Sequence, residues 1–111
     1  MKLTYAIKYV ADMDRSIAFH RDVLGLELKF QSPFWTEFAT GETSLALHPA
    51  MDGHKPGSVQ LGFAADSLGE FYARREELGL TFTQPPTEMH GMHIARFTDA
   101  DGAETSVSGP V

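Results

Sequence analysis

The feature that most constrains this chain is an internal repeat. Residues 1–50 and 57–111 each contain a strand-like stretch, a helix and then three strand-like stretches, in the same order. The two helices end in similar phrases, Val23-Leu24-Gly25-Leu26 and Glu77-Leu78-Gly79-Leu80. A unit of about 50 residues cannot bury one face of a sheet alone, so two such units must share a core. The repeat therefore predicts two βαβββ units in a single α+β domain that covers residues 1–111.

Alternating apolar side chains predict the strands, and capping residues predict the helices. Helices are expected from a cap at Asp12 or Asp14 to Leu24, and from a cap at Asp66 or Ser67 to Leu78. Residues 50–57, rich in Gly and Pro, are predicted to be a linker, and residues 85–91 a loop. The predicted strands are 3–10, 26–32, 34–40, 43–49, 58–63, 80–84, 92–98 and 103–108.

Composition and charge exclude several classes of partner. The formal charge is −6, from 15 acidic and 9 basic residues, and the basic residues form no cluster. Nucleic-acid binding is therefore not expected, since it requires a basic surface. The sequence has no cysteine for disulfides or thiolate metal sites, and no apolar run approaches the ~20 residues of a membrane span. The start lacks the apolar run of a signal peptide, so we expect a cytoplasmic protein.

Two phrases carry a resemblance to a known family. Residues 10–26, VADMDRSIAFHRDVLGL, closely resemble the opening of glyoxalase I and its relatives, with His20 where Tyr usually stands. Residues 97–104, FTDADGAE, resemble the closing Asp-Pro-Asp-Gly turn of the family, with Ala100 in place of Pro. The chain is identified as a member of the vicinal-oxygen-chelate superfamily, which includes glyoxalases, bleomycin resistance proteins and extradiol dioxygenases. The resemblance implies two βαβββ modules that form a curved mixed sheet cup, and a homodimer.

The resemblance also indicates where a metal would be held. Enzymes of this family bind one divalent metal with His and Glu side chains from four strands. Counted from the two phrases, the four positions fall on Tyr5, Ala46, Gln60 and Ser106. Hard divalent metals prefer carboxylate or imidazole ligands, so these residues make a poor site. We therefore expect no resident metal, although the family makes one possible.

The same faces of the strands predict the lining of the cup. Because side chains alternate along a strand, Trp35 and Glu37 share a face, as do Ala46 and His48. Aromatic bulk with a few placed polar groups is typical of a small-molecule pocket. The predicted ligand-binding residues are Tyr5, Trp35, Glu37, His48, Gln60, Arg96 and Ser106.

The charged and titratable residues of this lining have alternative roles. Glu37 and Arg96 form a structural ion pair in one interpretation. In the other, Arg96 binds a ligand carboxylate or Glu37 binds a ligand cation. His48 is a candidate general base, although a hydrogen-bonded sheet histidine is the more common case. Glu37 and Tyr5 are the other weak catalytic candidates.

The remaining histidines are left without an assigned role. His54 and His90 fall in segments rich in Gly and Pro, where a single histidine is usually solvated. A lid over the cup is one interpretation of the segment from His90 to His93, with Gly91 as a hinge and Met89 and Met92 as an apolar lip.

The function indicated by these residues is metal-free binding or sequestration of a small molecule, similar to the bleomycin-resistance branch. Two alternatives remain open. One is an enzyme, either a metal-dependent lyase, isomerase or dioxygenase, or a metal-free acid–base catalyst. The other is an interaction module that kept the fold but fills the cup with its own side chains.

Overall fold

The computed structural model describes all 111 residues and divides them into two compact units. The N-terminal unit is Thr4–Val59, and the C-terminal unit is Gln60–Val111 with Met1–Leu3. Each unit is described by itself below. No helix is both long enough and apolar enough to cross a membrane.

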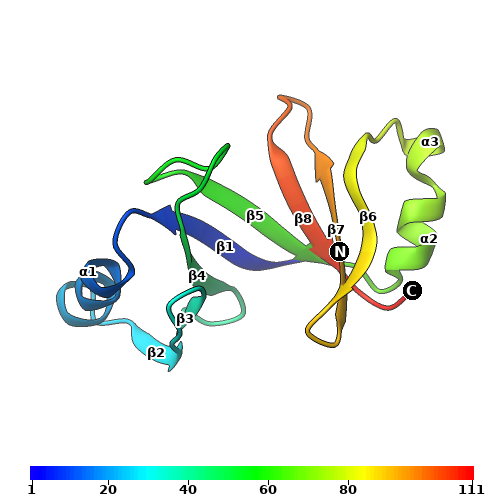
Figure 1. Cartoon of the computed structure of the whole chain (residues 1–111). Coiled ribbons are helices and arrows are strands. Elements are labelled where there is room, and N and C mark those ends of the chain that lie inside the picture. The colour runs from blue at the N-terminus through cyan, green and yellow to red at the C-terminus, as the bar shows by residue number, and fades with distance from the viewer. The chain divides into compact units, whose positions relative to one another are not determined.

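The N-terminal unit contains one βαβββ module (Figure 1). Its sheet has the order β2-β3-β4-β1, with β1 parallel to β4 and the other neighbours antiparallel. Its elements are β1 (Lys2–Val10), α1 (Met13–Ala18), the π-helical turn η1 (Phe19–Val23), β2 (Glu27–Phe30), β3 (Thr36–Ala39) and β4 (Ser44–Pro49).

The C-terminal unit repeats this arrangement. Its sheet has the order β5-β8-β7-β6, again with one parallel pair, β5 with β8, and antiparallel neighbours elsewhere. Its elements are β5 (Val59–Ala64), α2 (Leu68–Ala73), α3 (Arg75–Leu78), β6 (Phe82–Met89), β7 (Met92–Thr98) and β8 (Glu104–Ser108). The predicted α+β fold with a repeated βαβββ order is confirmed.

The core of the N-terminal unit lies between its helix and one face of its sheet. Val10, Ile17, Phe38 and Leu47 are buried together there. The helix begins where predicted, because the Asp12 carboxylate accepts the backbone N–H of Arg15. Leu47 and Phe38 lie on β4 and β3, so alternate residues of those strands must face the other side of the sheet.

The core of the C-terminal unit is built in the same way. Leu68, Ala95 and Val107 are buried between α2 and the sheet. Ser67 caps α2 with its side chain, and the carbonyl of Pro110 accepts the backbone N–H groups of Leu68 at 2.7 Å and Gly69 at 3.2 Å. The end of the chain therefore belongs to the folded C-terminal unit.

Four segments have more structure or a different structure than the sequence analysis expected. The prediction of a loop at 85–91 is wrong, because β6 runs to Met89 and only a two-residue turn follows it. Neither helix is continuous: the first changes to a π-helical turn at Phe19, and the second is interrupted at Arg74. The linker at 50–57 is ordered against β1, since the Gly57 N–H donates to the Tyr9 carbonyl at 2.8 Å.

A substitution at Gly109 tests how the C-terminal unit closes. Its φ of +155° disfavours other residues, and an added Cβ would collide with the carbonyl oxygen of Ala65. We expect Gly109→Ala to lower the free energy of unfolding by about 2–3 kcal/mol in chemical denaturation. Gly41→Ala is the control, because its φ is also positive but no atom lies within 4 Å of the added Cβ. Equal losses for both variants would contradict this account of the steric contact.

Candidate functional site

The face of the N-terminal sheet away from the helix carries a second buried cluster. Ile7, Tyr9 and Ala46 are buried there, with Tyr5 and Trp35 packed against them. The parallel register of β1 and β4 fixes this arrangement, because it sets Ile7 opposite Ala46. Most of the predicted lining of this unit therefore lies on one sheet face.

A carboxylate is held at the centre of this face by two aromatic residues. The Glu37 carboxylate accepts the indole Nε1–H of Trp35 at 3.0 Å and the phenol O–H of Tyr5. The two rings meet edge to face with their centroids 5.7 Å apart. No Lys or Arg side chain of the N-terminal unit forms an ion pair with Glu37. The hydrogen bonds fix the orientation of its carboxylate, but no positive charge in this unit neutralises it.

A small hydrogen-bonded turn positions the indole. The Ser32 hydroxyl accepts the backbone N–H of Trp35 at 2.9 Å and donates to its carbonyl at 2.8 Å. The Thr36 hydroxyl donates to the Ser32 carbonyl at 3.2 Å. These bonds join the turn to the start of β3, and they restrict the backbone that carries the ring.

His48 extends the same face toward the end of β4. Its Nδ1 lies 2.8 Å from the carbonyl oxygen of Pro49, which only accepts hydrogen bonds, so Nδ1 carries the proton. In the neutral ring Nε2 then holds a lone pair. His48 is thus both a hydrogen-bonded sheet histidine and a nitrogen able to accept a proton.

Two residues of this face were not among the predicted site residues. Tyr9 lies opposite His48 on β4, with ring centroids 5.2 Å apart, and it stacks on His54 at 4.3 Å. The alternation of Tyr5, Ile7 and Tyr9 along β1 was the available signal for Tyr9. No local pattern indicated that His54, expected to be solvated, would fold back onto β1. The residues called the aromatic cluster below are Tyr5, Tyr9, Trp35, Glu37, His48 and His54.

The C-terminal unit places its predicted site residues at equivalent positions of its own sheet. Ser106 lies opposite Arg96 on β7 and Gly62 on β5. Ala46 has the same place in the N-terminal unit, with Glu37 opposite it. The Ser106 hydroxyl lies 3.5 Å from the carbonyl of Leu61, and Gln60 is buried. The roles of these residues in ligand binding, and the Glu37–Arg96 pair, stay predictions.

The residues at the four metal positions do not fit a divalent metal. In the N-terminal unit they are the Tyr5 phenol and the methyl group of Ala46, which is fully buried beneath the aromatic cluster. In the C-terminal unit they are the Gln60 amide and the Ser106 hydroxyl. No group of three or more His, Asp or Glu side chains is placed to hold a metal ion. Carboxylate and imidazole donors are what such a metal requires.

The remaining loop histidines lie at the β6–β7 hairpin. His90 and Gly91 form the turn, and His93 lies on β7 opposite Glu88. The turn is short and joins two paired strands, so the long hinged segment expected for a lid is absent.

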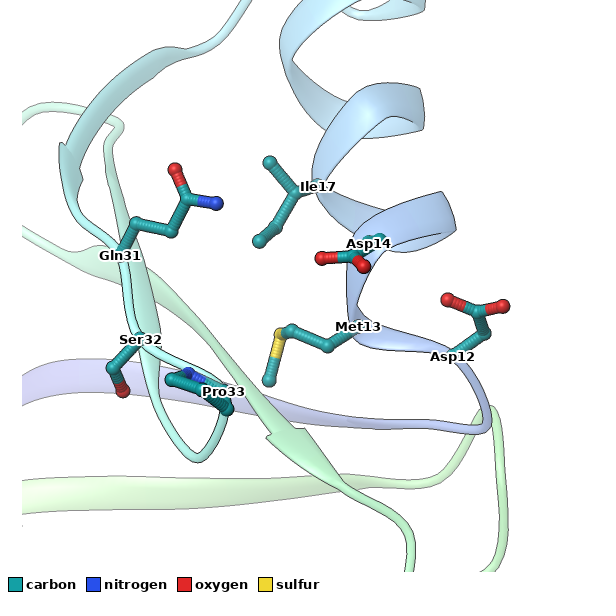
Figure 2. Close-up of a pocket in the computed structure, with 7 residues that line it drawn as sticks. All are labelled: Asp12, Met13, Asp14, Ile17, Gln31, Ser32 and Pro33. Atoms are coloured by element: carbon teal, nitrogen blue, oxygen red, sulfur yellow. The ribbon is translucent and has the colours of Figure 1, made fainter.

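A surface hollow of about 490 Å³ lies elsewhere in the N-terminal unit, on the helix side of the sheet (Figure 2). The side chains of Met13 and Ile17 form its apolar part, and Gln31 faces them from the far side (Figure 2). Two of its other polar groups have structural roles, because Asp12 caps the helix and Ser32 holds the following turn, and Asp14 is the remaining one. The hollow therefore adds nothing to the aromatic cluster.

A family model described as the glyoxalase, bleomycin resistance protein and dioxygenase superfamily matches residues 2–107. This match covers almost the whole chain, in agreement with the repeated βαβββ fold. The chain belongs to this superfamily.

Individual relatives are distant. An uncharacterised Bacillus subtilis protein, YurT, is 29% identical over 119 residues, which cover 92% of this chain and 94% of the relative. A hypothetical protein from Bacillus halodurans matches with a TM-score of 0.80 at 15% identity, over 99% and 94% of the two chains. A Streptomyces coelicolor methylmalonyl-CoA epimerase variant, in complex with 2-nitronate-propionyl-CoA, matches with a TM-score of 0.79 at 14% identity, over 100% and 98%. At these identities the two structures support the fold alone.

The Tyr5 phenol offers a pH test of the aromatic cluster. Burial raises the pKa of Tyr5, and the negative charge of Glu37 and the hydrogen bond to Glu37 raise it further. The folded protein therefore holds this proton more tightly than the unfolded chain does. We expect stability to fall as the pH rises above about 10, the unfolded pKa, through the higher folded pKa.

The phenol can be followed by NMR of ¹³C-labelled tyrosine, with Tyr5→Phe to assign its signal. Glu37→Gln should lower the pKa of Tyr5, because it removes the charge, but burial should still keep that pKa above the ordinary value. A titration of Tyr5 that is unchanged in Glu37→Gln would contradict the contact between these side chains.

Proposed function

We propose that this protein binds a small molecule without a metal, on the sheet face that carries the aromatic cluster. The observation that carries the proposal is the Glu37 carboxylate, which is held between Trp35 and Tyr5 and has no cationic partner in its unit. A partly buried charge without a counter-charge is costly, and a bound cation would offset that cost. The preferred ligand is therefore a cationic aromatic molecule.

The aromatic residues suit such a ligand in two ways. The faces of Trp35 and Tyr5 attract a cation through their ring quadrupoles, and the same faces stack on a flat ligand. The Ser32 turn holds the indole before the ligand arrives, so little side-chain freedom is lost on binding. The charge of −6 favours the approach of cations over longer distances.

The C-terminal unit is proposed to carry polar ligand-binding groups on its own sheet. Arg96 would bind a ligand carboxylate, with Gln60 and Ser106 as hydrogen-bonding groups. Their equivalence to Glu37, Tyr5 and Ala46 in the repeat supports this assignment. We further propose a cytoplasmic homodimer, and the open sheet edges at β2 and β6 support association.

Isothermal titration calorimetry with a panel of cationic aromatic drugs tests the ligand class. For a ligand that binds, we expect Glu37→Gln and Trp35→Ala each to weaken affinity about tenfold or more, since ~1.4 kcal/mol corresponds to tenfold. Phe34→Ala is the matched control, because Phe34 is adjacent to Trp35 but 75% exposed and outside the cluster. If no drug in the panel binds, this ligand class is rejected. If a drug binds equally to all three variants, the site lies elsewhere.

Elemental analysis tests the absence of a metal. Protein purified without an affinity tag, then incubated with Ni, Zn, Mn and Fe(II), should retain well below one metal per chain, because the donor set is Tyr, Ala, Gln and Ser. Stoichiometric metal would instead favour the lyase, isomerase or dioxygenase alternative. If dialysis removes the metal equally from Tyr5→Phe and from the wild type, the metal was bound weakly at the surface.

A second candidate function is metal-free acid–base catalysis, favoured by the proton-accepting Nε2 of His48. Glu37 and Tyr5 are the other candidate groups. The structural similarity to the epimerase suggests an assay with acyl-CoA thioesters in D₂O. Exchange of the α-proton for deuterium would be measured as the loss of its NMR signal. If the wild type exchanges the α-proton and His48→Asn does not, acid–base catalysis is supported. If no thioester exchanges, this reaction is rejected and binding remains the proposed function.

A further inference from the structure

Strands β6 and β7 are joined by a tight turn into a hairpin (Figure 1). Met89 and Met92 are direct partners in the antiparallel register, on either side of the turn formed by His90 and Gly91. Residues opposite each other in such a pair have Cβ atoms about 5 Å apart on the same side of the sheet. Methionine has three rotatable side-chain bonds, so the two sulfur atoms can converge on one point.

The thioethers lie on the face of the sheet away from the helix. Ala95 belongs to the core beneath α2, so the alternate residues Met92, Ile94 and Arg96 face the other side. Met89 and Met92 are 36% and 47% exposed. The Gln84 amide nitrogen lies 4.0 Å from the Met89 sulfur, so a polar group already borders this sulfur.

The residue in the turn is unusual for its conformation. His90 has a φ of 54°, and it is the one residue other than glycine with a positive φ. Both turn residues have positive φ, the arrangement that favours Asn-Gly or Gly-Gly. The turn that joins the two methionines thus carries a histidine at a position where the backbone disfavours it, and such outliers gather at binding sites.

We propose that Met89, His90 and Met92 form a site for a soft monovalent cation of the Cu(I) class. Thioether sulfur selects soft ions such as Cu(I), and imidazole is a good copper ligand. A hard divalent cation would gain little from two thioethers. Glu88 and the acidic charge of the chain add attraction for a cation. The site shares no residue with the aromatic cluster, so it does not depend on the proposed function.

Competition for Cu(I) tests the site. Under argon with a reductant, the protein is titrated into the coloured Cu(I)–bicinchoninate complex. We expect the wild type to withdraw one Cu(I) per chain, and Met89→Leu with Met92→Leu to weaken binding at least tenfold. Leucine conserves volume, so the fold should remain. His90→Asn should weaken binding while it keeps the turn, because Asn accepts a positive φ.

Met51→Leu is the matched control, since Met51 is also exposed but lies in the other unit. Ag(I) added to protein with ¹³C-methyl methionine should shift the methyl signals of Met89 and Met92 alone among the five methionines. The proposal is overturned if the wild type withdraws no Cu(I), if the Met89→Leu/Met92→Leu variant binds as the wild type does, or if Met51→Leu loses as much affinity as that variant.

Discussion

The parallel pairing of β1 with β4 is the constraint on which the N-terminal unit depends. It places Tyr5, Ile7 and Tyr9 in step with alternate residues of β4, ending with His48 beside Tyr9. Because the pleat has a period of two, a slip of β1 by one residue would turn these side chains toward the helix and send Val10 to the other face. The same register therefore determines both the hydrophobic core and the chemistry of the opposite face.

Sequence patterns predicted the strands well because each half-buried strand alternates. They failed for residues 85–89, where Pro85 and Pro86 indicated a loop, yet β6 is an edge strand that tolerates proline. For the candidate site, the alternation that located Trp35 and Glu37 on one face was sufficient. It could not predict the Trp35–Glu37 bond or the stacking of His54 on Tyr9, which depend on rotamers and on the path of a distant loop.

The two modules keep one backbone plan but place different chemistry on it. Where the N-terminal unit has Glu37 opposite Ala46, the C-terminal unit has Arg96 opposite Ser106, and the residues two places earlier are Trp35 and Ile94. One module therefore offers an acidic aromatic surface and the other a basic aliphatic one. The same backbone plan therefore carries different surface chemistry in its two copies.

The carbonyl of Pro110, which accepts the first two amides of α2, has a consequence during synthesis. These amides are orphan donors until the residue about 40 positions later is in place. A ribosome exposes the chain from its N-terminus, so α2 emerges well before its partner does. This contact at the start of α2 can therefore form only after Pro110 has been synthesised. One carbonyl group thus ties the completion of α2 to a residue much later in the chain.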